Sequence, residues 1–203
     1  MGLKYENSAV RRAQIMEAAG KIIIRRGSEH LTVKGIALEV GISEGDIYRH
    51  FKSKKDVLLF LLDSVRDRLL SEYVKPGLPG SGLSLLQAAL ENHISAVSRR
   101  GGISFQIIAE IISLGDKELN ARASVALELF AGRLEELLIT AKSQGDIREG
   151  LDTGATARAI SAMIQGLVNT WVLGNYQFDL KAEFKTMWQI LVTGLGRNGQ
   201  EGG

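Results

Sequence analysis

Apolar side chains recur at intervals of three and four residues along the chain, which is the period of one face of an α-helix. The first two segments with this pattern run from Ala9 to about Arg26, with a face at Ile15, Ala19, Ile22 and Ile23, and from Val33 to Val40, with a face at Val33, Ile36, Ala37 and Val40. Gly27 and Gly41 follow these segments directly, in the position of a glycine that ends a helix. The pattern therefore predicts two short amphipathic helices, each closed by a glycine.

Two serines mark the starts of the next two helices. Ser43 with Asp46 and Ser53 with Asp56 both match the capping box, in which the serine oxygen accepts a hydrogen bond from a backbone N–H at the start of a helix. The helix after Ser53 is long, because its apolar residues continue to Leu69. We expect it to run over residues 54–74 and to connect two domains.

The rest of the chain also reads as helical. Further helices are predicted near residues 83–99, 103–114, 118–143, 153–174 and 180–195, while both prolines fall in the loop sequence KPGLPGSG and no hairpin signal occurs. The expected fold class is all-α, with about nine helices. We expect an N-terminal domain of residues 1–56, with the connector helix 54–74, and a C-terminal helical domain of residues 57–203.

Composition narrows the class of protein. The absence of cysteine excludes disulfides, thiolate metal sites and cysteine nucleophiles, and no stretch approaches the roughly 20 apolar residues that span a bilayer. Residues 1–56 hold 11 Lys and Arg against 7 Asp and Glu, whereas residues 57–203 hold 14 against 16. We therefore expect a soluble, cytoplasmic protein without membrane contact, whose basic N-terminal part meets a polyanion.

The run LTVKGIALEVGISEGDIYRHFKSKKD, residues 31–56, has the order helix, glycine turn, helix. In a helix-turn-helix the first helix braces across the DNA backbone and the second lies in the major groove, with its N-terminal half toward the bases. Cationic and hydroxyl-bearing side chains that follow are suited to phosphate oxygens. The predicted DNA-binding residues are Thr32, Lys34, Ser43, Glu44, Gly45, Tyr48, His50 and Lys54.

Several of these positions have a second interpretation. Asp46 is expected to cap its helix rather than to read a base, because Ser43 and Asp46 at this spacing satisfy the first backbone N–H groups of the helix. Tyr48 has a half-buried packing role as its alternative, and Lys52 and Lys55 are equally well explained as solvated surface charge. Arg11 and Arg12 either follow the DNA or begin the first helix in solvent.

The segments AAGKIIIRRG, LTVKGIALEVGISEGDIYRHF and SKKDVLLFLLD, which begin at residues 18, 31 and 53, resemble the TetR family of bacterial transcriptional regulators. The resemblance covers about a quarter of the chain. It implies a homodimeric repressor that binds a palindromic double-stranded DNA operator and is released by a small-molecule effector. It also implies that Tyr48, His50 and Lys54 contact phosphates and that Thr32 begins the bracing helix.

The last two predicted helices are apolar over wide faces. A helix that is apolar on most sides needs partners on two sides, and a second copy of the chain supplies one of them. We expect these helices to form a four-helix dimer interface that contains Ala159, Met163, Gly166, Leu167, Phe184, Trp188, Leu191 and Leu195. Burial of the same faces within a single chain is the alternative.

An effector pocket is expected in the C-terminal domain, where isolated polar groups stand among apolar ones. The candidate lining residues are His93, Phe105, Ile108, Ile112, Phe130, Leu134, Met163, Gln165, Asn169 and Trp171. Each polar one has a satisfied core residue as its alternative. As a hypothesis, ligand binding tilts the connector helix and changes the separation of two recognition helices, which DNA requires at roughly 34–36 Å.

Two other classes of protein compete with a regulator. An enzyme is not expected, because the three histidines lack metal-site spacing and GLPGSG lacks the Lys-Ser/Thr of a phosphate loop. We expect no catalytic residue, no metal and no cofactor. The second alternative is a helical ligand-binding or adaptor protein without DNA binding, which salt-sensitive duplex binding would separate from a regulator.

Overall fold

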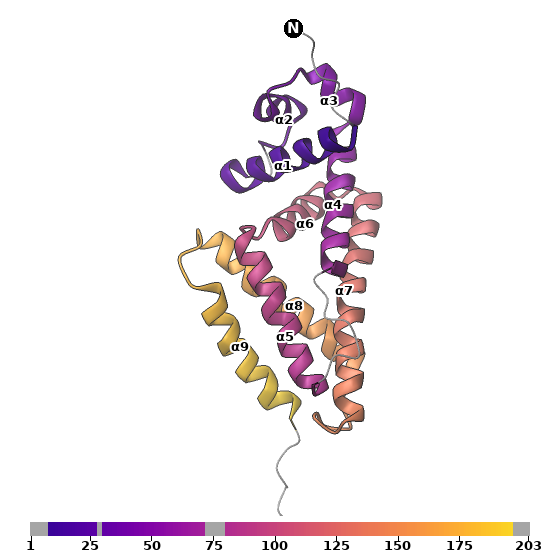
Figure 1. The fold of residues 1–203 in the computed structure, drawn as a ribbon, viewed down its shortest axis with the longest axis vertical. Coiled ribbons are helices and arrows are strands. Elements are labelled where there is room, and N and C mark those ends of the chain that lie inside the picture. The colour runs from indigo at the N-terminus through magenta and orange to yellow at the C-terminus, as the bar shows by residue number, and fades with distance from the viewer. Residues whose placement is uncertain (1–7, 28–29, 72–79, 197–203) are drawn as a thin grey trace, which may run out of the picture. The chain divides into compact units, whose positions relative to one another are not determined.

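The computed structural model describes residues 8–27, 30–71 and 80–196, and these residues form nine α-helices without strands (Figure 1). In chain order the helices are α1 (Ser8–Arg26), α2 (Val33–Val40), α3 (Glu44–His50), α4 (Lys54–Ser71), α5 (Gly82–Arg99), α6 (Ile103–Leu114), α7 (Lys117–Ser143), α8 (Thr153–Leu173) and α9 (Leu180–Leu195). The all-α prediction is confirmed. The expected end of the connector helix at residue 74 and the prolines at 76 and 79 lie outside the described residues. None of the described helices has the length and apolar character needed to cross a membrane.

Local sequence signals set the ends of the first helices. Gly27 and Gly41 have φ of 88° and 76°, the left-handed region that only glycine enters without a steric cost. The Gly41 N–H donates to the Ala37 carbonyl at 2.9 Å and so closes α2. Thr32 and Ser43 cap the starts of α2 and α3 through their side-chain oxygens. The turn between the two helices is therefore fixed on both sides by residues that prefer these conformations.

The chain folds into two compact units. Unit 1 comprises residues 1–65 and 103–123, and unit 2 comprises residues 66–102 and 124–203. The sequence prediction placed a single boundary at residue 56, whereas α6 and the start of α7 join the N-terminal helices. The reason is that α6 buries Ile107 and Ile111 in unit 1, where it contacts α1. The chain consequently passes from one unit to the other within α4, just before α6 and within α7.

The core of unit 1 is built from the predicted apolar faces. Its largest fully buried side chains include Ile15, Ile23, Leu31, Ile36, Ile47, Phe51, Leu58 and Leu62. Burial of each such side chain stabilises the fold by about 1.5–3 kcal/mol. At Gly20 the backbone of α1 comes close to α6, since an added Cβ would lie 2.7 Å from Ile103 Cδ1. The recognition helix α3 thus packs on α1 and α2, and α1 in turn packs on α6.

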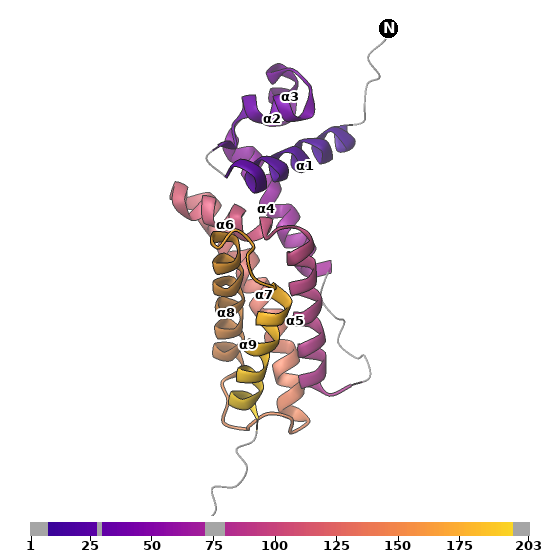
Figure 2. The ribbon, with the colours of Figure 1, turned by 90° about the vertical axis from the view of Figure 1, so that its left-hand side faces the viewer.

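Unit 2 is a helical bundle in which α5, α7, α8 and α9 lie side by side (Figure 2). Helix α9 contacts both α5 and α8. The start of α5 approaches the end of α7, where the Gly82 N–H donates to Gln144 Oε1 at 2.6 Å. The buried side chains between the helices include Leu86, Leu90, Ile94, Leu138, Ile160, Ile164, Val168, Phe184 and Trp188.

Candidate functional site

The first turn of α3 is exposed to solvent, and its own side chains cap it through hydrogen bonds. The Ser43 hydroxyl donates to Asp46 Oδ2 at 2.7 Å, and the Asp46 N–H donates back to Ser43 Oγ at 3.1 Å. Arg49 Nη1 donates to the other carboxylate oxygen of Asp46 at 3.1 Å. The hydrogen bond from the Ser43 side chain is the main cause that lowers the pKa of Asp46. The interpretation of Asp46 as a capping residue is confirmed, which leaves Glu44 and Gly45 as the exposed residues at this end of α3.

The rest of the exposed face of the helix-turn-helix carries side chains that can donate hydrogen bonds to DNA phosphates. Tyr48 is 51 % exposed, so its ring lies outside the core of unit 1. Lys34 and Lys52 are exposed, and His50 is half-buried. Thr32 is exposed as well, but its Oγ1 accepts the Gly35 N–H at 2.9 Å and so already caps α2. The face therefore offers phenol, ammonium and imidazole groups, and their contact with DNA stays a prediction.

The two lysines that begin α4 are held by acids from a distant part of the chain. Lys54 Nζ lies 2.7 Å from Glu110 Oε1 on α6. Lys55 Nζ lies 3.0 Å from Asp116 Oδ2 and 2.9 Å from Glu118 Oε2. The hydrogen bonds to Glu118 and Asp116 raise the pKa of Lys55. The pKa of Asp116 is lowered, first by the Leu119 N–H and then by Lys55.

Arg12 has a role that neither of its sequence interpretations contained. Its guanidinium carbon lies 5.2 Å from the ring centroid of Phe51 and 4.8 Å from that of Phe60, which is the geometry of cation–π contacts. Phe51 ends α3 and Phe60 belongs to α4. Arg12 therefore links the start of α1 to the C-terminal end of the recognition helix α3. Arg11 donates to Gln14 Oε1 at 2.9 Å on α1 itself.

A small cavity in unit 2 contains three of the predicted pocket residues. Its volume is about 20 Å³, and it is lined by Leu69, Ala89, Leu90, His93, Phe130, Arg133 and Leu134. His93 is buried, with its ring centroid 4.8 Å from that of Phe130. This volume has room for about one water molecule. An effector that binds here must therefore push α5 and α7 apart.

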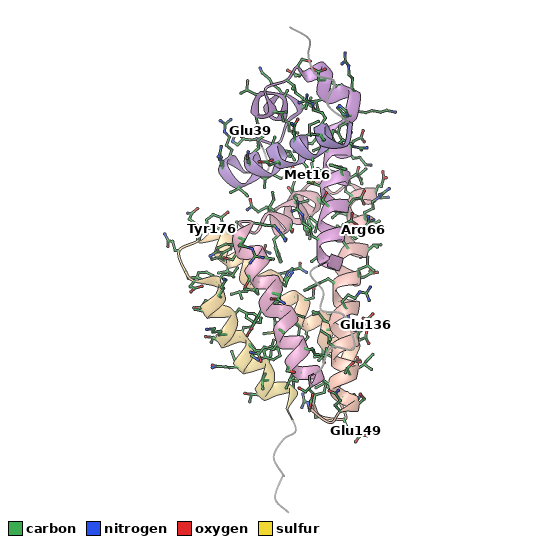
Figure 3. All side chains as sticks on the ribbon, viewed as in Figure 1. Met16, Glu39, Arg66, Glu136, Glu149 and Tyr176 are labelled. Carbon is green, nitrogen blue, oxygen red and sulfur yellow. The ribbon has the colours of Figure 1, made fainter. Side chains whose placement is uncertain are left out.

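The other predicted pocket residues do not gather at this cavity. Phe105, Ile108 and Ile112 belong to unit 1, where Ile108 is buried and Ile112 is 66 % exposed. The Trp171 indole donates to the Phe178 carbonyl at 3.0 Å, and its ring meets that of Tyr176 edge-on. Tyr176 lies in the turn between α8 and α9 (Figure 3). Trp171 is thus a satisfied core residue.

Three residues of α8 correct the pocket prediction in another way. Met163 and Asn169 are exposed and Gln165 is half-buried, because the buried face of the helix consists of Ala157, Ile160, Ser161, Ile164, Val168 and Trp171. Successive residues are about 100° apart around a helix, which turns Met163 and Asn169 away from that face. A helix that is apolar nearly all round gave no sequence signal to choose between its faces.

Of the residues predicted to form the dimer interface, some lie on the surface of unit 2 and others are buried in its core. Ala159, Met163 and Gly166 are exposed on α8, and Leu167 and Leu191 are half-buried. Phe184, Trp188 and Leu195 are buried within unit 2, which corrects their assignment to an outer face. These large side chains are what fixes α9 on its own bundle. The sequence reasoning missed Ile190, which is 64 % exposed and lies off the apolar stripe of α9.

A capped helix-turn-helix with an exposed second helix and basic residues around it, joined to a separate helical bundle, defines a class of proteins: DNA-binding transcriptional regulators. The N-terminal part matches the family of bacterial regulatory proteins called the tetR family over residues 15–60. The larger C-terminal part matches the C-terminal region of YsiA-like proteins over residues 81–194. The chain belongs to the TetR family of bacterial transcriptional regulators.

Individual relatives align along most of their length. The fatty acid metabolism regulator protein of Bacillus subtilis is 26 % identical over 186 residues, which cover 90 % of this chain and 94 % of the relative. The transcriptional repressor BepR of Brucella suis is 28 % identical and aligned over 85 % and 86 % of the two chains. The crystal structure of the regulator FadR from Bacillus subtilis with stearoyl-CoA superposes with a TM-score of 0.73 at 25 % identity, over 90 % of this chain and 98 % of FadR.

Proposed function

We propose that this regulator is a cytoplasmic homodimer that represses transcription from a palindromic operator and is released by a long-chain acyl thioester. The observation that carries the DNA-binding half of the proposal is the exposed face of α3, with Tyr48 outside the core and cationic residues around it. The relative BepR is itself named a repressor. Operator binding by a two-fold dimer then places one recognition helix in each half-site.

The outer face of unit 2 supports the dimer. Small or apolar residues recur along the exposed side of α8 at the spacing of one helical face, at Ala155, Ala159, Ala162, Gly166 and Leu173. An added Cβ at Gly166 would meet nothing within 4 Å, so a partner helix has room to come close there. On α9, Ile190 is a further large apolar side chain that is exposed. In a two-fold dimer, the exposed sides of α8 and α9 would pack against the same sides of α8 and α9 in the partner subunit.

The ligand class rests on relatives and on the cavity. The Bacillus subtilis regulator is named for fatty acid metabolism, and the FadR structure holds stearoyl-CoA. The cavity is lined mostly by aliphatic and aromatic side chains, while Arg133 supplies a cation that also pairs with Glu136. An apolar wall with one cation suits a ligand with a hydrocarbon chain and an anionic head.

Release requires that the ligand favour a conformation that DNA does not. A ligand shifts an equilibrium only by its difference in affinity for the two states, and couplings of about 1–3 kcal/mol are typical. Widening of the cavity would displace α5 and α7, and α7 continues from unit 2 into unit 1. Helix α4 continues between the units in the same way. These two helices are the routes that we propose for the coupling.

Titration of stearoyl-CoA into a labelled duplex bound by the protein tests the ligand half of the proposal. We expect stearoyl-CoA to release the duplex and CoA alone to leave it bound, because only the former carries a hydrocarbon chain that would enter and widen the apolar cavity. Arg133→Gln is expected to weaken release about tenfold, since it removes one charge-assisted contact. The matched control is Arg148→Gln, an exposed arginine that does not line this cavity.

Release by CoA alone, or equal release from both arginine variants, would show that this cavity is not the acyl site. Failure of stearoyl-CoA and of shorter acyl thioesters to release the duplex would remove acyl thioesters as the ligand class. It would leave DNA binding by α3 untouched, because the duplex is bound before any ligand is added.

A further inference from the structure

Both lysines at the start of α4 reach acids that lie more than fifty residues further along the chain. Lys54 and Lys55 follow the recognition helix by a short loop, and Lys54 is among the residues that the family resemblance assigns to DNA phosphates. In the structure the Lys54 ammonium lies 2.7 Å from Glu110 on α6. The Lys55 ammonium lies within 3.0 Å of both Asp116 and Glu118. All five residues belong to unit 1.

Burial makes the first of these pairs hard to break. The side chain of Glu110 is only 10 % exposed, and that of Lys54 is 33 % exposed. A carboxylate removed from water loses much of its hydration, so it keeps its charge only when a cation or several donors compensate it. Movement of Lys54 to a phosphate would therefore leave Glu110 without the cation that lies beside it. The two pairs of Lys55, whose acids are more exposed than Glu110, carry a smaller penalty of this kind.

The pairs also change the charge that DNA meets. Affinity for DNA rises with the number of phosphates neutralised, since each one releases condensed counterions. An ammonium that already neutralises a carboxylate adds no net charge at the distance of the DNA backbone. The basic balance of the N-terminal sequence thus overstates the charge that the folded unit presents, because the compensating acids come from α6 and from the start of α7.

We propose that Glu110 is a negative determinant of DNA affinity, which withholds the Lys54 ammonium from the DNA backbone. Asp116 and Glu118 act in the same way on Lys55. Glu110 works through Lys54 rather than by contact with DNA, so it is a positioning residue. The proposal rests on DNA binding by the helix-turn-helix and is independent of which ligand, if any, releases the operator.

The test compares Glu110→Gln with the wild type in the absence of any effector. Glutamine keeps the shape and a hydrogen-bond acceptor for Lys54 but removes the charge. Anisotropy titration with one fixed, labelled DNA duplex is run at several salt concentrations between about 50 and 200 mM. We expect tighter binding at low salt and a log–log salt slope that is steeper by about 0.9 per protomer. Glu136→Gln is the control, since it removes the same charge from an exposed ion pair on α7 in unit 2 (Figure 3).

A second substitution distinguishes the effect of a freed Lys54 ammonium from a general destabilisation of unit 1. In the Glu110→Gln background, Lys54→Gln is expected to return the salt slope to that of the wild type, because the freed ammonium is gone. Lys54→Gln alone is expected to leave the slope unchanged. A lower thermal stability of Glu110→Gln with an unchanged slope would show that the pair is structural only, and a lower DNA affinity would show that Glu110 assists Lys54. Either result overturns the proposal.

The exposed pair keeps the proposal testable if Glu110→Gln does not fold. Glu118 is 52 % exposed, so Glu118→Gln is expected to keep the fold. In this variant Asp116 still pairs with Lys55, so we expect a smaller increase in the salt slope than for Glu110→Gln. A slope equal to that of Glu136→Gln would contradict the withholding of Lys55.

Discussion

Replacement of Gly166 by glutamate is expected to turn the proposed dimer into a monomer and to reduce sequence-specific DNA binding by about a thousandfold or more. Gly166 lies in the middle of the exposed face of α8, and a two-fold interface would bring two such carboxylates together without partners. A monomer contacts a single half-site, so its affinity falls toward that of non-specific binding. Light scattering after gel filtration gives the mass, and anisotropy gives the affinity.

The matched control is Gly132→Glu on α7. An added Cβ meets nothing within 4 Å at either glycine, so both variants are expected to keep the helical fold of the wild type. The α8 face would be refuted as the dimer interface if Gly166→Glu remained a dimer. Loss of the dimer in Gly132→Glu alone would point to the surface of α7 instead.

Substitution of Gly82 by alanine is expected to destabilise unit 2 strongly. Gly82 begins α5 where it touches the backbone of α7, and an added Cβ would meet the main chain of Ala141 and come within 2.8 Å of the Thr140 carbonyl carbon. Backbone atoms of a packed helix cannot move aside as a flexible side chain does. Overpacking of this kind costs about 1–3 kcal/mol and sometimes more. Each kcal/mol lowers the melting temperature of a chain of this size by about 2–4 °C.

Gly132→Ala serves as the opposite control for this substitution. Gly132 lies inside α7 with open space around its Cα, so alanine there removes only the flexibility of the unfolded chain. It is expected to stabilise the protein by about 0.5–1 kcal/mol. Urea denaturation followed by circular dichroism measures both variants. A Gly82→Ala variant as stable as the wild type would mean that α5 does not approach α7 as closely as the structure has it.

Local chemistry explains why the helices of unit 1 could be predicted from the sequence. Gly41 and Ser43 each prefer the conformation that they adopt, and the Ser43–Asp46 hydrogen bonds span three residues. Such signals act within one helical turn, so they are visible in a short stretch of sequence. The apolar periodicity of α5 to α9 is also visible in short stretches of sequence, and it predicts the bounds of these helices within a few residues.

Contacts between distant segments could not be predicted in this way. Nothing near Lys54 in the sequence indicates that Glu110 neutralises it, because the two are brought together only by the packing of α6 in unit 1. Composition also cannot separate the buried Trp188 from the exposed Ile190, since both are large and apolar. Which face of α8 or α9 is covered depends on the whole bundle, and this is why the pocket and interface predictions were only partly correct.

Sequence-specific DNA binding by α3 is tested by selection of duplexes from a random DNA pool with the purified protein, followed by anisotropy titration of the recovered sequence. We expect an enriched palindrome that a dimer binds with an affinity that falls steeply as salt rises. The absence of any enriched sequence, for protein unfolded and refolded to remove a retained ligand, would contradict the claim that the exposed face of α3 reads DNA.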